Sequence, residues 1–419
     1  MTLLRQSPGF GLLISRILVL FKHGLSLSVI WWLVAVPALA VEMRVAIGDR
    51  LSQVTVGSST PAIVKNQAGQ GVGQIPQGRS VVVTPAGGNV RLADWQGQAF
   101  WVEPTGGGYV FINDSWYRGK VLVVPVEGRV TAINWVDLEA YLYGVVGSEM
   151  PASWPLEALK SQAVAARSYA LYRRDRTQGQ LFDVGGTTAH QVYRGLAGEA
   201  PSVHAAVNAT QGQVLTHGGR VIEAVFHSSS GGHTENSEDI WQRPTPYLRG
   251  VADFDQEAPV FQWSETFSAQ QLGQRIVGIG QLQSVATERS TPRGRIVSMR
   301  LQGSQGSRTL TGPELRQALG LRSTLLSFNI AGNTIRVDGR GFGHGLGMSQ
   351  WGARGLATRG QNYQQILTHY YQGTALSSLR MAEAPGPQIA LNFPLGTLNL
   401  PTRDGQRLLQ PALSYLPVR

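Results

Sequence analysis

An acidic residue, Glu149, stands in a mostly apolar and aromatic part of the stretch YLYGVVGSEMPASWPLEALKSQAVAARSYALY. Six residues later, Pro155 indicates the start of a helix, because proline is tolerated in the first helical turn. The apolar residues from Leu156 to Ala170 then follow helical spacing. This pattern predicts that Glu149 lies on a short turn between a strand-like segment, 141–146, and a long Ala-rich helix.

The side chain of Glu149 could act as a general acid or could cap the helix that follows it. Apolar surroundings would raise its pKa, whereas the nearby helix N-terminus would favour the anion, and the sequence leaves open which effect wins. Most glycosidases need two carboxylates, and no second acid is obvious here, since Asp137 and Glu139 precede it and Glu157 lies within the helix. One acid suffices if the substrate supplies its own nucleophile.

A glycine-rich segment, 339–347, has glycine at every other position and fits no phosphate-binding motif. Such glycine density allows close approach of the backbone to a ligand or to another segment. Within it, His344 could bond sugar hydroxyls, orient Glu149 or hold the loop together. Ser349 and Gln350 follow, and each could bond backbone or glycan.

The segment 226–232, FHSSSGG, predicts a small polar loop after a strand. A serine nucleophile is disfavoured because the G-x-S-x-G pattern is absent, so Ser228 and Ser229 fit a sugar-binding edge better. The spacing of nearby acids and histidines matches no standard metal site and favours a solvated acidic loop. These residues are His227, His233, Glu235, Glu238 and Asp239.

Several motifs together resemble the SpoIID/LytB family, over roughly residues 120 to 375. The first block comprises Gly144-Val145-Val146, Glu149-Met150-Pro151, Trp154-Pro155, Ala158-Leu159-Lys160, Gln162-Ala163 and Ala165-Ala166-Arg167. Three further segments agree in the same order: Gln191-Val192-Tyr193, Ser228 to Gly232 with Thr234 and Trp241, and Gly339 to Ala353.

The resemblance implies a lytic transglycosylase, in which the C6 hydroxyl of a muramoyl sugar attacks its own anomeric carbon and leaves a 1,6-anhydro end. Glu149 matches the family's catalytic glutamate. The alternatives are a non-catalytic activator of an N-acetylmuramoyl-L-alanine amidase, since one family member is named as an amidase enhancer, and a wall-binding structural protein. Family motifs also contain the expected substrate-binding residues, Arg167, Tyr193, Ser228, Ser229, His344, Ser349 and Gln350, and the best candidates for lining a glycan groove, Trp154, Trp241 and Trp351.

Some members of that family hold zinc with two cysteines and a histidine just before the Gln-Val-Tyr motif. At the corresponding positions this chain has Gly185, Ala189 and His190, and it contains no cysteine. One histidine cannot hold zinc alone, so we expect neither a metal nor another cofactor.

The N-terminus combines basic residues, a short apolar run and Ala38-Leu39-Ala40, which is typical of a secretory signal cleaved after Ala40. An uncleaved N-terminal anchor is the alternative, and it would be the chain's only membrane contact. Of the formal net charge of +10, about +7 lies beyond this leader. We therefore expect an exported protein of the periplasm, cell wall or extracellular membrane side, whose partners are anionic peptidoglycan glycan strands or a cell-wall amidase rather than nucleic acid.

The predicted organisation is a leader (1–40), a β-rich region (41–119), the family domain (120–375) and a Pro-rich tail (376–419). Helices and strands alternate without regular βαβ units, which favours an α+β fold with largely antiparallel sheets. Strands are expected at 54–56, 80–83, 109–112, 296–301 and 333–337, a hairpin turn at Glu127-Gly128, and further helices at 203–210, 269–277, 312–319 and 352–371.

Overall fold

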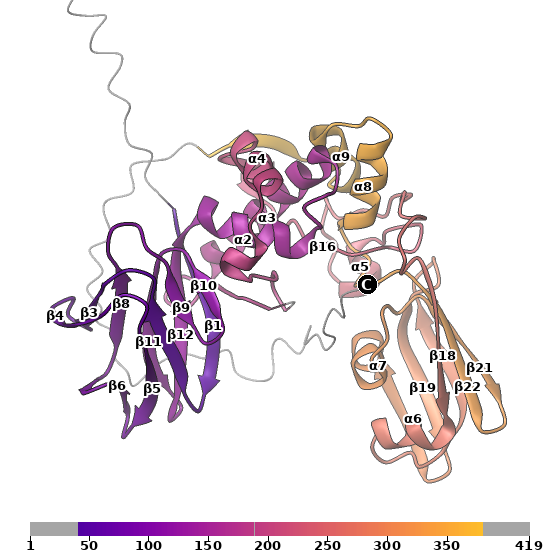
Figure 1. Cartoon of the computed structure of the whole chain (residues 1–419). Coiled ribbons are helices and arrows are strands. Elements are labelled where there is room, and N and C mark those ends of the chain that lie inside the picture. Colours follow the sequence, from indigo (N-terminus) through magenta and orange to yellow (C-terminus); the bar gives the residue numbers. More distant parts are fainter. Residues whose placement is uncertain (1–40, 188, 380–419) are drawn as a thin grey trace, which may run out of the picture. The chain divides into compact units, whose positions relative to one another are not determined.

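A computed structural model describes residues 41–187 and 189–379 (Figure 1). The predicted leader and nearly all of the predicted tail lie outside these residues. α-Helices are mixed with mainly antiparallel sheets, which confirms the α+β class. Within the described ranges, no helix is both long enough and apolar enough to cross a membrane.

The Val-rich runs of the first hundred described residues form two sheets that share one hydrophobic core. In spatial order, the first sheet contains β13 (Val184–Gly185), β1 (Glu42–Leu51), β12 (Arg129–Asp137), β11 (Lys120–Val126), β8 (Phe100–Pro104), β3 (Ala62–Asn66) and β4 (Gly71–Ile75). The second contains β10 (Ser115–Tyr117), β9 (Val110–Ile112), β2 (Val54–Ser58), β5 (Ser80–Ala86), β6 (Asn89–Leu92) and β7 (Trp95–Gly97). The three predicted N-terminal strands are thus present as β2, β5 and β9.

The β11–β12 hairpin turns at Glu127 and Gly128, as predicted. Both residues have positive φ, 51° and 72°, which matches the right-handed twist of the paired strands. β12 also pairs with β1 along most of its length, from Glu42 opposite Asp137 onward. One continuous sheet therefore crosses residue 119, where the sequence suggested a boundary.

The segment 141–146 is helical, so the prediction of a strand there is wrong. α2 (Leu138–Glu149) begins at Asp137, whose carboxylate accepts the backbone N–H groups of Glu139 and Ala140. Its apolar residues are buried, and a short apolar run of this kind does not distinguish a strand from a buried helix. Glu149 is consequently the last residue of a helix.

α3 (Leu156–Arg176) follows Pro155 and is the long Ala-rich helix that the sequence predicted. Its buried alanines let other elements pack closely, and it contacts α2, α4 (Pro201–Ala209), α8 (Gln350–Thr358) and α9 (Tyr363–Tyr370) (Figure 1). α4, α8 and α9 confirm the helices expected in those regions. A small sheet, β15 (Arg220–Val221), β14 (Gln213–His217) and β24 (Ala375–Ser378), also packs on α3 through β14 and β15.

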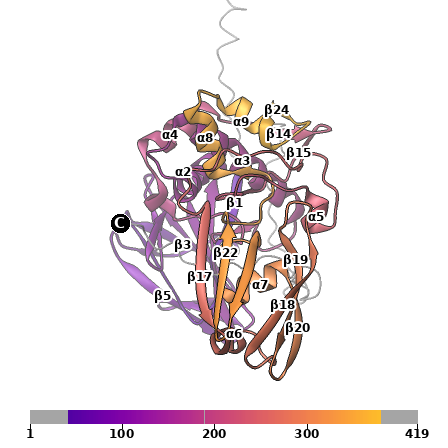
Figure 2. The ribbon, with the colours of Figure 1, turned by 90° about the vertical axis from the view of Figure 1, so that its right-hand side faces the viewer.

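Residues 262–340, which we call the lobe, have a hydrophobic cluster of their own that the sequence did not reveal. One lobe sheet contains β17 (Gln262–Ser268), β22 (Thr334–Arg340) and β21 (Leu326–Ala331), and the other contains β18 (Leu282–Ser290), β19 (Ile296–Gly303) and β20 (Gly306–Thr311) (Figure 2). The predicted helices are α6 (Ala269–Arg275) and α7 (Gly312–Leu319). Between α4 and the lobe, the chain forms β16 (Phe226–His227) and α5 (Ser237–Trp241), and β23 (Met348–Ser349) follows the glycine-rich loop.

Glycines allow α2 to approach the short 3-10 helix η2 (Gly195–Gly198) closely. A methyl group at Gly147 would lie 1.8 Å from the carbonyl oxygen of Gly198, and one at Gly198 would lie 2.2 Å from the carbonyl oxygen of Gly144. The end of α2 that holds Glu149 is therefore fixed by backbone packing against the segment just after Val192.

Replacing Gly147 by Ala should lower the free energy of unfolding by about 1–3 kcal/mol, because overpacking outweighs the better helix propensity of alanine. Chemical denaturation of the mature protein measures the change. Gly71→Ala is the control, since its methyl group would meet only one atom, 4.0 Å away. Equal stability of the two variants would contradict the proposed close approach.

Candidate functional site

Two distant segments hold the carboxyl group of Glu149. The backbone N–H of Val192 donates to its Oε1 at 2.7 Å, and Nε2 of Gln350 donates to its Oε2 at 3.0 Å. The Glu149 side chain remains partly open to solvent, whereas Gln350 is only 4% exposed. The structure therefore joins three of the segments that the sequence singled out around one acid.

The pKa of Glu149 is raised above its ordinary value. Burial is the largest cause, and the hydrogen bonds from Val192 and Gln350 and the charge of Arg194 only partly oppose it. The position of the acid at the C-terminal end of α2 acts in the same direction as burial, because that end of a helix carries partial negative charge. Burial thus wins the competition that the sequence left open.

A buried polar chain positions the backbone of Val192. The preceding residue, Gln191, is fully buried, and its Oε1 accepts the hydroxyl of Tyr141 at 3.1 Å. Its Nε2 donates to the carbonyl oxygen of Ala166 in α3 at 3.2 Å. Gln191 therefore links α2 and α3 and aims the next N–H at Glu149.

The pairing of β16 with β23 positions Gln350. These short strands run parallel, with Phe226 opposite Met348, and the backbone N–H of Trp351 donates to the carbonyl oxygen of Ser228 at 3.0 Å. Ser349 caps α8, because its Oγ accepts the N–H of Gly352 at 3.1 Å. Ser349 is buried and Ser228 is half-buried, so Ser228 is the more accessible of these two predicted substrate-binding residues.

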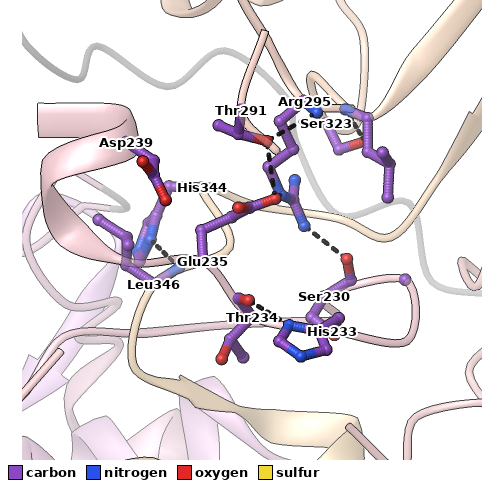
Figure 3. Close-up of polar contacts among 12 residues, drawn as sticks. Ser230, His233, Thr234, Glu235, Asp239, Thr291, Arg295, Ser323, His344 and Leu346 are labelled. Atoms are coloured by element: carbon purple, nitrogen blue, oxygen red, sulfur yellow. Dashed lines mark hydrogen bonds and ion pairs between the residues drawn. The ribbon is translucent and has the colours of Figure 1, made fainter. Parts of the chain in front are cut away.

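His344 uses both ring nitrogens within the protein. Its Nδ1 accepts the N–H of Leu346 at 3.1 Å, so Nε2 carries the proton and donates to the carbonyl oxygen of Phe226 at 3.0 Å (Figure 3 shows His344 and Leu346). Burial, and next the guanidinium of Arg316, lower the pKa of His344 to about 4. These contacts favour the loop-holding role among the alternatives for His344.

Ser229 and Ser230 belong to a buried polar network. The Ser229 hydroxyl donates to Asp255, and the Ser230 hydroxyl donates to Asp253. Sequence reasoning missed both aspartates, because neither belongs to a motif of known spacing. The Ser229 side chain has no exposed surface in this arrangement.

Arg295 of the lobe enters the same network (Figure 3). Its Nη2 donates to the carbonyl oxygen of Ser230, and its Nε lies 3.4 Å from the carboxylate of Glu235. Glu235 also accepts the hydroxyl of Thr291 at 3.1 Å and is 2% exposed. The prediction of a solvated acidic loop is therefore wrong for Glu235, whose burial raises its pKa although the guanidinium of Arg295, distant in sequence, partly opposes this.

Two other predicted substrate-binding residues are enclosed. Arg167 is fully buried, and its guanidinium binds the carboxylate of Glu139 and the carbonyl oxygen of Gln213. Tyr193 is 4% exposed, and its hydroxyl donates to Asn134 Oδ1 at 3.0 Å. We infer that both position the scaffold, since neither side chain has surface left for a ligand.

Of the three residues at the positions of the family's zinc ligands, His190 is the one whose side chain can bind a metal, and it lies beside a cation. Nη2 of Arg173 is 3.3 Å from its Nε2, and the N–H of Gly185 is directed at its Nδ1. Burial and the charge of Arg173 lower the pKa of His190 to about 4. An adjacent guanidinium repels a metal ion, and the described residues contain no cluster of three potential ligands among His, Cys, Asp and Glu.

An aromatic pair joins the segment just after Glu149 to the residue just after Gln350. Trp154 and Trp351 meet edge to face with ring centroids 4.8 Å apart, and the guanidinium of Arg354 lies over the ring of Trp351 at 5.2 Å. Both tryptophans are partly exposed. The third groove candidate, Trp241, contacts His344 with ring centroids 6.3 Å apart.

Comparison with known proteins identifies the family. Residues 126–217 match the family model described as stage II sporulation protein. Stage II sporulation protein D of Bacillus subtilis is 37% identical to this chain over 283 residues, which are 62% of this chain and 80% of that protein. The chain belongs to the SpoIID family.

Other relatives of this SpoIID-family chain have different names. An uncharacterized protein of Brachyspira hyodysenteriae is 33% identical over 270 residues, covering 62% of this chain and 72% of that protein. A protein of Bacillus subtilis named amidase enhancer is 34% identical over 292 residues, covering 57% of this chain but only 40% of that protein. Residues 236–347, which include the lobe, match a second family model, described as a domain of unknown function.

The raised pKa of Glu149 predicts how stability depends on pH. Because the pKa is higher in the folded chain, the stability that the protonated acid contributes is present below about pH 4 and is lost as the pH rises through the folded value. Glu149→Gln should therefore gain thermal stability over the wild type between pH 4 and 7.5. Thermal unfolding of both proteins across that range measures the difference.

Glu157→Gln is the control for this experiment, with the opposite trend. Burial raises the pKa of Glu157, but hydrogen bonds from Lys160 and Tyr363 outweigh it and leave the pKa lowered. That variant should lose stability relative to the wild type as the pH rises. A parallel trend for both variants would refute the opposite electrostatic environments assigned to the two acids.

Proposed function

We propose that this protein is an exported lytic transglycosylase that cleaves peptidoglycan glycan strands between MurNAc and GlcNAc, with Glu149 as its general acid and base. One observation carries the proposal. The Glu149 carboxyl has a raised pKa, is held by donors from two distant segments and is still partly open to solvent. Family membership supports the same activity, through the resemblance described above.

The proposed reaction uses one carboxyl group twice. Protonated Glu149 gives its proton to the glycosidic oxygen while the bond from that oxygen to C1 of the muramoyl sugar breaks. The carboxylate that remains then takes the proton of the sugar's C6 hydroxyl as its oxygen bonds to C1. The products are a 1,6-anhydro end and a free hydroxyl, no water is consumed, and Glu149 is protonated again.

The surroundings of Glu149 suit both protonation states. Burial raises the pKa of Glu149 and so favours the protonated carboxyl before the reaction, and the Val192 N–H and the Gln350 amide stabilise the transient carboxylate. The charge of Arg194 also favours the carboxylate form of Glu149. A single acid of this kind favours an internal nucleophile over the two-carboxylate mechanisms of most glycosidases.

We assign the contacts with the substrate to residues near Glu149 whose side chains are partly exposed. Sugar rings would stack on the partly exposed faces of Trp154 and Trp351, and Ser228 would contact the strand from the neighbouring loop. The buried residues Ser229 and Ser349 and the half-buried His344 would hold the loops that support these contacts. The predicted leader supports export to the cell envelope, where glycan strands occur.

A second candidate function is activation of a cell-wall amidase. The similarity to the protein named amidase enhancer favours it, although the chain covers only 40% of that protein. Adding the wild type and Glu149→Gln to an N-acetylmuramoyl-L-alanine amidase separates the two functions. Equal stimulation by both forms, without new glycan ends, would support the activator role in place of the enzymatic one.

Mature protein incubated with purified glycan strands, with and without stem peptides, should produce new 1,6-anhydro ends detectable by mass spectrometry. Glu149→Gln should reduce the rate by at least about 10²-fold, because general acid–base catalysis contributes on that order. Circular dichroism shows whether the variant is folded. Absence of cleavage by folded wild type on either substrate would exclude the enzymatic proposal.

Replacing Gln350 by Ala should shift the pH dependence of cleavage. Its amide stabilises the carboxylate, so its loss raises the pKa of Glu149 further. The acid then stays protonated to higher pH. The alkaline limb of the pH–rate profile should therefore shift to higher pH, while the maximal rate falls. Gln350→Glu adds a negative charge in the same place and should shift that limb in the same direction. An unchanged alkaline limb in both variants would mean that Gln350 does not influence the pKa of Glu149.

A further inference from the structure

A cavity of about 580 Å³ lies at the C-terminal end of α3, beside β14 and β15. Its walls come from the last two turns of α3, the β14–β15 hairpin and the segment 243–247 that follows α5. Its volume is within the range of sites that bind small ligands or parts of polymers. The proposed reaction at Glu149 makes no use of it.

The walls of this cavity are rich in cations. Arg176, Arg220 and Arg243 line it together with His217, and Asp175 is the acid that lines it. Arginine guanidinium groups match the geometry of carboxylate and phosphate groups and bind them through paired hydrogen bonds. The composition therefore fits an anionic ligand.

The arginines are only weakly engaged with the protein. The side chain of Arg220 is exposed and forms no hydrogen bond or ion pair within the part of the chain that the structure describes. Arg243 approaches Glu223 at 3.5 Å, and Arg176 approaches Asp175 at 3.9 Å while its guanidinium lies over the ring of Tyr172. Most of their donors therefore remain available to a ligand.

One face of α3 connects the cavity with the acid. Tyr169, Tyr172 and Arg176 are spaced so that they lie on the same side of the helix, and the last two line the cavity. Burial raises the pKa of Tyr169 to about 12, and both Glu149 and Glu223 contribute to the shift. Tyr169 lies about one turn before Tyr172 on this face, and the charges of both Glu149 and Glu223 act on it.

We propose that this cavity is a subsite that binds a carboxylate carried by the same glycan strand whose glycosidic bond lies at Glu149. The proposal rests on the proposed function, because it takes the glycan strand as the ligand of the site. Two groups on such a strand carry the required chemistry: the lactyl carboxylate of a muramoyl sugar without its stem peptide, and the carboxylates of a stem peptide. Recognition of either would fix which sugar of the strand reaches the acid.

The test measures binding and not cleavage. In the Glu149→Gln background, fluorescence anisotropy at fixed ionic strength follows three labelled strands: peptide-free, peptide-bearing, and peptide-free with the lactyl carboxylates converted to neutral amides. Arg220→Ala combined with Arg243→Ala removes two cavity cations. Arg289→Ala combined with Arg300→Ala removes the same charge from exposed positions on β18 and β19 and serves as the control.

The Arg220/Arg243 double variant should bind a carboxylate-bearing strand about tenfold more weakly, as expected for two partly exposed charge-assisted contacts. The neutral strand should bind equally to all proteins, and the control pair should change binding by less than about twofold. A loss confined to peptide-bearing strands assigns the stem-peptide carboxylates, and a loss with peptide-free strands assigns the lactyl group.

Two results would overturn the subsite: equal binding by the double variant and the control, or an equal loss for neutral and charged strands. These results are independent of the enzymatic proposal, because cleavage by the wild type is measured separately. Carboxylate-dependent binding without cleavage would overturn the enzymatic proposal and leave the subsite intact.

Discussion

The arrangement of this protein depends on keeping one carboxyl group in a place where its charge is disfavoured. Burial and the C-terminal end of α2 both oppose ionisation of Glu149, whereas the hydrogen bonds from Val192 and Gln350 and the charge of Arg194 favour it. Because these effects oppose one another, small changes in the surroundings of Glu149 change its pKa and hence its protonation. The donors must therefore be held firmly, and much of the structure around the site does this.

Buried polar contacts supply that rigidity. Gln191 joins α2 to α3, and the pair of Arg167 with Glu139 joins the same two helices, with Arg167 fully buried and Glu139 partly exposed. On the other side, the hydrogen bonds of His344 join the glycine-rich loop to β16. Because removing one member of a buried pair leaves its partner unsatisfied, these contacts specify a single arrangement of the loops.

The sequence predicted much of the local structure. Pro155 marked the start of α3, Glu127-Gly128 marked a hairpin, and the motifs identified both the family and the segment of the acid. It failed where the outcome depends on burial, since the apolar run 141–146 fits a strand as well as a helix. It also could not pair Glu235 with Arg295 or show that Arg167 is enclosed, because such contacts join residues far apart in the chain and carry no local signal.

The lobe has a consequence for how the chain reaches its folded state. Residues 261 and 341, at its two ends, are joined by a backbone hydrogen bond of 3.0 Å, next to the paired strands β17 and β22. Closing a long loop costs entropy and slows folding. We infer that a lobe that folds early on its own core shortens the chain that must close before His227 can lie opposite Ser349. The segment that supplies Gln350 would then reach Glu149 as a late step in folding, so the protein would acquire its complete site only after the lobe has formed.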